Sequence, residues 1–148
     1  MLVLGSLPGQ ASLRAARYYA HPTNQFWRLM AGVIGREDLP GLDYDARIAA
    51  LNEAGVGLWD TIASAIRPGS LDAAIRDMAA RDLAAFVADL PSLRAVGFNG
   101  GTSARIGRQQ LAGTALALID LPSSSAAHAG LPLAAKQERW LALREYLR

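Results

Sequence analysis

Residues 94–120 of the chain read RAVGFNGGTSARIGRQQLAGTALALID. The apolar run 94–98 predicts a strand, residues 101–111 predict a helix, and residues 115–120 predict a second strand. A strand, a helix and a strand in this order are typical of two parallel strands joined by a crossover helix. This segment therefore predicts an α/β fold.

Two further strands are expected, over residues 1–5 and within residues 55–62. The intervening segments have helical patterns or caps: residues 12–18 with Ser12 as cap, 24–34, 43–54 with Asp43 as cap, 70–78, 81–90 and 133–147. Four short strands separated by helices predict a parallel sheet with helices on both faces. Sites in such sheets lie at the carboxyl ends of the strands.

The composition predicts one globular domain over residues 1–148. The chain is 51% apolar, 19% charged and free of cysteine, which excludes a disordered chain and a disulfide scaffold. No apolar run reaches the roughly 18 residues that span a bilayer, and the N-terminus lacks a signal-peptide pattern. We therefore expect a cytoplasmic protein without membrane association. The only lysine, Lys136, precedes Gln137, so a Walker A loop is excluded.

Polar, glycine-rich segments follow all four predicted strands, and we expect them to converge on one crevice. They are Gly5–Ser12, Asp60–Ser70, Asn99–Ser103 and Pro122–Gly130. The first, GSLPGQAS, can present backbone amides to an anion or a carbonyl, although composition alone favours an ordinary tight turn. The segment LPSSSAAH at 121–128 suits phosphate contacts, with a surface loop as the alternative.

A further segment, YYAHPTNQFW at 18–27, joins two aromatic residues to a fixed asparagine. Asn24 is a natural helix cap. An aromatic side chain followed by an asparagine can also stack on a planar base and hydrogen-bond a water or a base edge. The residues alone leave both interpretations open, and the same holds for Asn99 in FNGG, where an Asx turn is the alternative.

Together, these segments resemble the uracil-DNA glycosylase superfamily. GSLPG, YYAHPTNQFW, FNG and LPSSSAAH occur in order over nearly the whole chain and are most similar to the hypoxanthine (deoxyinosine) DNA glycosylase branch. The mismatch-specific uracil/thymine glycosylases are a near second. The resemblance implies a single uracil-DNA-glycosylase-like domain over 1–148. It also implies a three-layer α/β/α fold with a four-stranded, mainly parallel central sheet.

The resemblance also implies roles for individual residues. Asn24 and Asn99 are implied as catalytic. Contacts to the flipped base are implied for Gly5, Ser6, Leu7, Pro8, Gly9, Tyr19 and Phe98. DNA contacts through the loop after the fourth strand are implied for Pro122, Ser123, Ser124, Ser125 and His128. Leu7 stands where the mismatch-specific enzymes carry a catalytic asparagine, and Ala126 stands where many relatives carry proline.

The expected reaction is base excision. Flipping a base costs a few kcal/mol, least for a damaged or mismatched pair. Asn24 is expected to orient the attacking water, and Asn99 with the first turn to stabilise the departing anionic base. His21 or Asp60 is an alternative residue for assisting the attack of this water. Since no lysine lies near a motif in the sequence, a monofunctional glycosylase without a lyase step is expected.

Two rival classes remain open on the residues. Ser103, Asp120 and His128 occur in the order of a serine hydrolase triad. A damaged-DNA binding module that has lost catalysis is the non-enzymatic alternative. The predicted partner is DNA containing a deaminated base, hypoxanthine and/or uracil. We expect a monomer, with no metal or organic cofactor.

Overall fold

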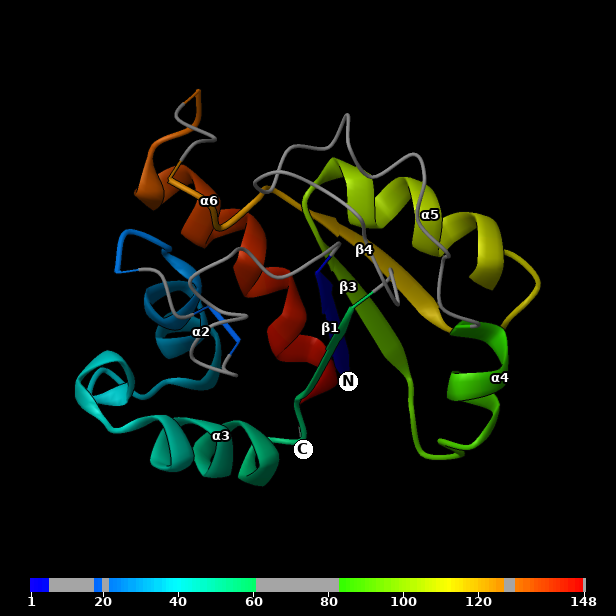
Figure 1. The fold of residues 1–148 in the computed structure, drawn as a ribbon, viewed down its shortest axis with the longest axis horizontal. Helices are drawn as coiled ribbons and strands as arrows, with labels where there is room; N and C mark the ends of the chain where they lie inside the picture. Colours follow the sequence, from blue (N-terminus) through cyan, green and yellow to red (C-terminus); the bar gives the residue numbers. More distant parts are fainter. Residues whose placement is uncertain (6–17, 20–21, 61–82, 127–129, 148) are drawn as a thin grey trace, which may run out of the picture.

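The computed structural model describes residues 1–5, 18–19, 22–60, 83–126 and 130–147, and its centre is a parallel sheet (Figure 1). The strands are β1 (Leu2–Gly5), β2 (Gly57–Asp60), β3 (Ala95–Asn99) and β4 (Ala117–Leu121). Their order is β2-β1-β3-β4, and each described pairing is parallel. This confirms the predicted α/β fold with a four-stranded parallel sheet.

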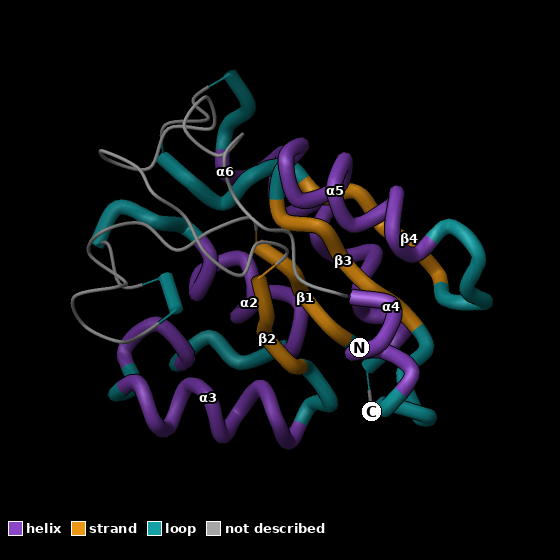
Figure 2. Tube along the Cα trace, turned by 45° about the vertical axis from the view of Figure 1, so that its right-hand side comes forward, coloured by secondary structure: helices purple, strands orange, loops and turns teal. Residues whose placement is uncertain are grey.

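Helices cover both faces of the sheet (Figures 1 and 2). One face carries α2 (Phe26–Ile34), α3 (Tyr44–Glu53) and α6 (Leu133–Trp140). The other carries α4 (Leu83–Ala88) and α5 (Gly101–Leu111). Two short 3-10 helices, η1 (Leu39–Gly41) and η3 (Leu141–Tyr146), complete the described elements. None of the described helices combines the length and the apolar character that a membrane span requires.

Alternation along β1 divides the core into two parts. Val3 packs with the α2 and α6 side, whereas Leu2 and Leu4 pack with α4 and α5. Successive side chains of a strand point to opposite faces, so one apolar strand serves both layers. On the neighbouring strand β3, the side chain of Phe98 packs on the α5 side and is completely buried.

Two glycines allow α5 to follow β3 in a sharp turn and to pack closely against it. Gly107 lies so close to Phe98 that a Cβ atom there would overlap the ring. Gly100, between β3 and α5, has a φ of 96° and donates its N–H to the Leu121 carbonyl at 3.0 Å. Side chains other than glycine rarely adopt this φ, so Gly100 allows the sharp turn that follows Asn99.

The observed elements differ from the predictions mainly at their ends. Helix α2 begins at Phe26 rather than at Asn24. The helix predicted over 133–147 is α-helical only to Trp140, after which η3 continues it. The predicted helices at 12–18 and 70–78 lie outside the described residues. Within 81–90, the described helix is α4.

Candidate active site

Three residues from separate segments meet through hydrogen bonds at the carboxyl end of the sheet. Asn24 precedes α2, Asn99 ends β3, and Ser124 lies in the loop after β4. The Ser124 hydroxyl donates to Asn24 Oδ1 at 2.9 Å and accepts from Asn99 Nδ2 at 2.9 Å. The Ser124 backbone N–H donates to Asn99 Oδ1 at 2.9 Å. We call Asn24, Asn99 and Ser124 the amide network.

The topology explains why these residues are close. The β3–β4 register pairs Asn99 with Leu121, so the loop beginning at Pro122 leaves the sheet beside Asn99. The β1–β3 register pairs Leu4 with Phe98, which places Gly5 at the same edge. The backbone N–H of Gln25 donates to the Ser124 carbonyl at 2.9 Å and brings the start of α2 to this loop.

The hydrogen bonds of Asn24 determine which part of its amide remains available. Its Oδ1 accepts from the Phe26 N–H at 2.9 Å and from the Ser124 hydroxyl. An amide oxygen has two lone pairs, and here both have a donor. The Asn24 group left for a ligand is therefore the amide NH2 at Nδ2, which can donate hydrogen bonds but not accept them. The local bond to Phe26 also shows that Asn24 fixes the entry into α2, although Gln25 is the helix N-cap.

The Asn99 amide is arranged in the opposite sense. Its Nδ2 donates to Ser124 Oγ and to the Tyr19 hydroxyl, the latter at 3.2 Å. Both Nδ2 hydrogens therefore have acceptors, and the remaining capacity of Asn99 is one lone pair on Oδ1. In this arrangement Asn99 holds the amide network and Tyr19 in place, and it has no donor left for a departing base.

Tyr19 is held from two sides. Its ring stacks on Phe26 with centroids 3.8 Å apart and an interplanar angle of 16°. Its hydroxyl accepts from Asn99. Its φ of 54° lies in the left-handed region, which costs an aromatic residue on the order of 1–3 kcal/mol. Since Phe26 covers one face of the ring, stacking on a base is restricted to the opposite face.

The loop after β4 is supported from beneath by α6. Trp140 Nε1 donates to the Pro122 carbonyl at 2.9 Å. One turn earlier, Lys136 Nζ donates to the Ser125 carbonyl at 3.3 Å and to Gln25 Oε1 at 2.9 Å. Lys136 is only 1% exposed, and its burial lowers the pKa of its ammonium group. Lys136, which lies outside the motifs in the sequence, therefore contacts the loop after β4 in the fold.

The structure gathers some of the predicted site residues and leaves others apart. Tyr19, Asn24, Asn99 and Ser124 are joined, with Gly5 at the same edge and Pro122, Ser123 and Ser125 in the adjoining loop. The Phe98 ring is not part of the group, because it is buried against α5. The remaining predicted residues lie outside the described part of the chain: Ser6, Leu7, Pro8, Gly9, His21 and His128.

The geometry of Ser103 contradicts the serine hydrolase hypothesis. Its hydroxyl is fully buried and donates to the Leu4 carbonyl at 2.7 Å. Asp120 pairs instead with Arg108 at 2.7 Å. A nucleophile must reach a substrate and a base, and this hydroxyl is occupied within the core. Among the described residues, there is also no cluster of three side chains able to hold a metal ion.

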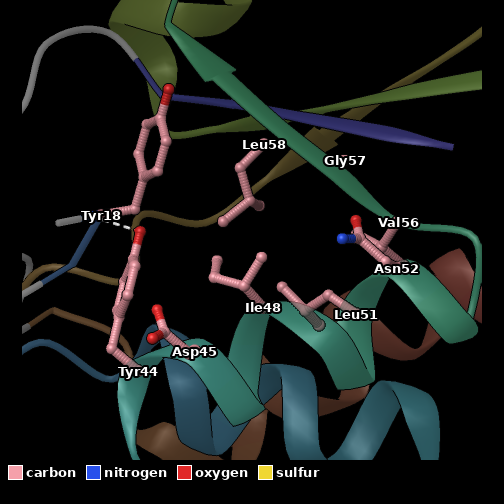
Figure 3. A pocket seen from close by; sticks show the side chains of 9 residues that line it. All are labelled: Tyr18, Tyr44, Asp45, Ile48, Leu51, Asn52, Val56, Gly57 and Leu58. Atoms are coloured by element: carbon pink, nitrogen blue, oxygen red, sulfur yellow. Dashed lines mark hydrogen bonds between the residues drawn. The ribbon is translucent and has the colours of Figure 1, made fainter.

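A cavity of about 440 Å³ lies elsewhere, between α3 and β2 (Figure 3). Leu58 on β2 faces Ile48 and Leu51 on α3 across it, and Tyr18 and Tyr44 close one end. No residue of the amide network lines this cavity. The segments that the family resemblance singles out meet instead in the amide network, which is therefore the stronger candidate for chemistry.

The fold and this network define a parallel α/β domain whose polar site is built from amides and a hydroxyl at the carboxyl ends of the strands. The family model of the uracil DNA glycosylase superfamily matches residues 1–144. The chain belongs to this superfamily.

Relatives of assigned function support the same placement. A hypoxanthine DNA glycosylase from Methanosarcina barkeri is 42% identical over 103 residues, covering 70% of this chain and 65% of that protein. A hypoxanthine DNA glycosylase from Methanosarcina acetivorans is 37% identical over 128 residues, covering 86% and 80%. The solution NMR structure of a candidate uracil DNA glycosylase from M. acetivorans superposes with a TM-score of 0.85 at 34% identity, covering 98% and 88%.

Gln25, Lys136 and Trp140 are site-supporting residues that the sequence analysis did not identify. Lys136 and Trp140 are four residues apart and share one face of α6. A lone lysine on the apolar face of a predicted helix is the signal that could have found them.

Proposed function

We propose that the protein is a DNA glycosylase that removes hypoxanthine from DNA containing deoxyinosine. The observation that carries this proposal is the amide network at the carboxyl end of the sheet. In it both lone pairs of Asn24 Oδ1 have donors, so Nδ2 is the group left for a ligand, and Asn99 is bonded to Tyr19. The family and the identity to two hypoxanthine DNA glycosylases support the substrate class.

The proposed reaction breaks the bond between the base and C1′ of the sugar. The electron pair stays on the base, water supplies a hydroxyl group to C1′, and the water's other proton ends on the released base. Negative charge therefore grows on the base in the transition state. A fixed N–H donor stabilises such a charge more than it stabilises the neutral base, which is the requirement for catalysis.

We assign this donor role to Asn24. Its oxygen is occupied by Phe26 and Ser124, so it lacks the acceptor needed to take a hydrogen bond from an attacking water. We therefore propose for Asn24 the stabilisation of the departing base in place of the expected orientation of the water. Asn99 is assigned to holding Ser124 and Tyr19, because both its N–H groups are used there.

The loop at 122–126 is assigned to contacts with the DNA backbone. Its Pro122 and Ser125 carbonyls point to donors on α6. These two bonds hold the loop against α6, and the hydroxyls of Ser123 and Ser125 are donors of the kind that contact phosphate oxygens and position a protein on DNA without reading the sequence.

The test is direct measurement of released base. The protein is incubated with labelled duplexes that contain one deoxyinosine, one deoxyuridine or neither, and free base is measured by mass spectrometry. Release of hypoxanthine with multiple turnovers supports the proposal. Duplex binding without release of either base would support the binding-module alternative, and release of uracil alone would contradict the substrate assignment.

A further inference from the structure

Lys136 is a buried charged group to which the proposed reaction assigns no role. It is the only lysine in the chain, and it lies on α6 with 1% of its surface exposed. Its recorded partners are neutral oxygens, on Gln25 and on the backbone of Ser125. No carboxylate pairs with it among the described residues. Burying an ammonium group is costly, and neutral acceptors offset only part of this cost.

The two acceptors belong to two of the three segments that form the amide network. Gln25 follows Asn24 directly, and Ser125 follows Ser124 directly. A single ammonium nitrogen therefore links the start of α2 to the loop after β4. The residues that it links, Gln25 and Ser125, are the sequence neighbours of Asn24 and Ser124, which are themselves joined by a hydrogen bond.

An ammonium group suits this position because a single small nitrogen carries three N–H donors, which can reach acceptors on two segments. A planar guanidinium needs more volume and presents its donors in a fixed fork. The other 14 basic residues of the chain are arginines, and among the residues that the structure describes Lys136 is the one fully buried basic side chain, which is consistent with this geometric requirement.

We propose that Lys136 is a positioning residue, whose bridge between Gln25 and Ser125 sets the separation of Asn24 and Ser124, and through Ser124 the placement of Asn99, for base excision. This inference rests on the proposed function for its catalytic consequence. Its structural content is that loss of the bridge changes the surroundings of both asparagine amides.

The principal variant is Lys136→Met, which keeps an unbranched apolar stem and removes the ammonium. Misplacement of reacting groups by about 1 Å can cost about 100-fold in rate. We expect the single-turnover rate of hypoxanthine release to fall between 10- and 100-fold, as an order-of-magnitude estimate on the same basis. The affinity for product DNA should change far less, because the bridge uses the Ser125 carbonyl, and a carbonyl oxygen cannot donate to a phosphate.

The matched control is Gln137→Met, on the next residue of the same helix. Gln137 Nε2 donates to the Leu29 carbonyl at 3.1 Å, so the control also loses a hydrogen bond from α6 to α2. That bond does not involve the amide network. We expect the control to keep the wild-type rate per folded molecule.

A second readout does not depend on activity. The chain has asparagine at only three positions, 24, 52 and 99, so selective ¹⁵N labelling gives three side-chain amide pairs. Lys136→Met should shift the signals of Asn24 and Asn99 and leave those of the exposed Asn52 in place. Gln137→Met should shift none of them. If Lys136→Met does not fold, Gln25→Met removes the other end of the bridge and should shift the same two signals.

The outcomes separate the two proposals. If the wild-type protein releases no base, the proposed function fails and the amide signals alone decide the role of Lys136. If the wild-type protein is active while Lys136→Met keeps both its rate and its amide signals, the positioning role is overturned. A covalent adduct with abasic DNA, trapped by borohydride in the wild type and absent in Lys136→Met, would also overturn it by making the lysine a nucleophile.

Discussion

The substitution Ser124→Ala removes the hydroxyl that joins the two site asparagines. This side chain is 1% exposed, and its Oγ takes part in one bond to Asn24 and one bond to Asn99. Removing one partner of a buried polar group costs about 1–3 kcal/mol. The Asn24 oxygen keeps its donor on Phe26 and Asn99 Nδ2 keeps its bond to the Tyr19 hydroxyl, so we expect a stability loss of about 1–3 kcal/mol and not a multiple of it.

We also expect the rate per folded molecule to fall, and a loss of stability alone does not lower that rate. Without the hydroxyl, the Asn24 amide can turn and lose the orientation that presents Nδ2. A loss of about 1.4–2.8 kcal/mol in transition-state stabilisation corresponds to a rate lower by about 10- to 100-fold. The assay is single-turnover release of hypoxanthine from a duplex, with the folded fraction measured by urea unfolding under the same conditions.

Ser103→Ala is the matched control for this prediction. Its hydroxyl is equally buried and loses one hydrogen bond, to the Leu4 carbonyl, on the other side of the sheet. We expect a similar stability loss with the wild-type rate per folded molecule. If Ser124→Ala and Ser103→Ala lose similar stability and both keep the wild-type rate, the catalytic role of the amide network is refuted.

Three further predictions concern the support of the site. Gly107→Ala should destabilise the fold by about 1–3 kcal/mol, because its Cβ meets the buried Phe98 ring, and should leave the rate per folded molecule unchanged; an equally stable variant in urea unfolding would contradict this packing. Trp140→Phe leaves the Pro122 carbonyl without its donor, so we expect a loss of about 1–3 kcal/mol in the same assay, and an unchanged midpoint would contradict the bond. Burial lowers the pKa of the Lys136 ammonium, so the folded state loses this proton at a lower pH than the unfolded chain, and wild-type stability relative to Lys136→Met should rise with pH toward the ordinary value of 10.5; a flat difference would contradict the burial.

Much of the fold follows from local sequence pattern. The strands are short apolar runs such as LVLG, and each is followed by polar or glycine-rich residues that mark a turn. Those same residues locate the site, since the carboxyl ends of parallel strands share one edge. Asn24 and Asn99 were predicted for this reason, together with the resemblance to the family.

The direction of individual side chains was harder to predict. Phe98 and Asn99 are neighbours in β3, yet the first is buried against α5 and the second bonds to Ser124. Successive side chains of a strand point to opposite faces of the sheet, so Phe98 and Asn99 are not expected to contact the same base. Similarly, nothing in the run SSS shows that the middle hydroxyl is the buried one.

Contacts between distant segments account for the rest. Lys136 is 111 residues from Gln25 in sequence, and no local pattern connects them. The change from α6 to η3 after Trp140 also has no marker, because no glycine or proline stands there.

The most direct test of the proposed chemistry is the rate of hypoxanthine release by Asn24→Asp. An aspartate keeps an oxygen for the Phe26 N–H and the Ser124 hydroxyl but replaces the Nδ2 donor with a second acceptor. If Asn24 stabilises the departing base as a donor, the rate should fall by about 100- to 1,000-fold, as for the loss of one oxyanion donor. A variant that releases hypoxanthine as fast as the wild type, or faster, would show that this position serves the attacking water instead.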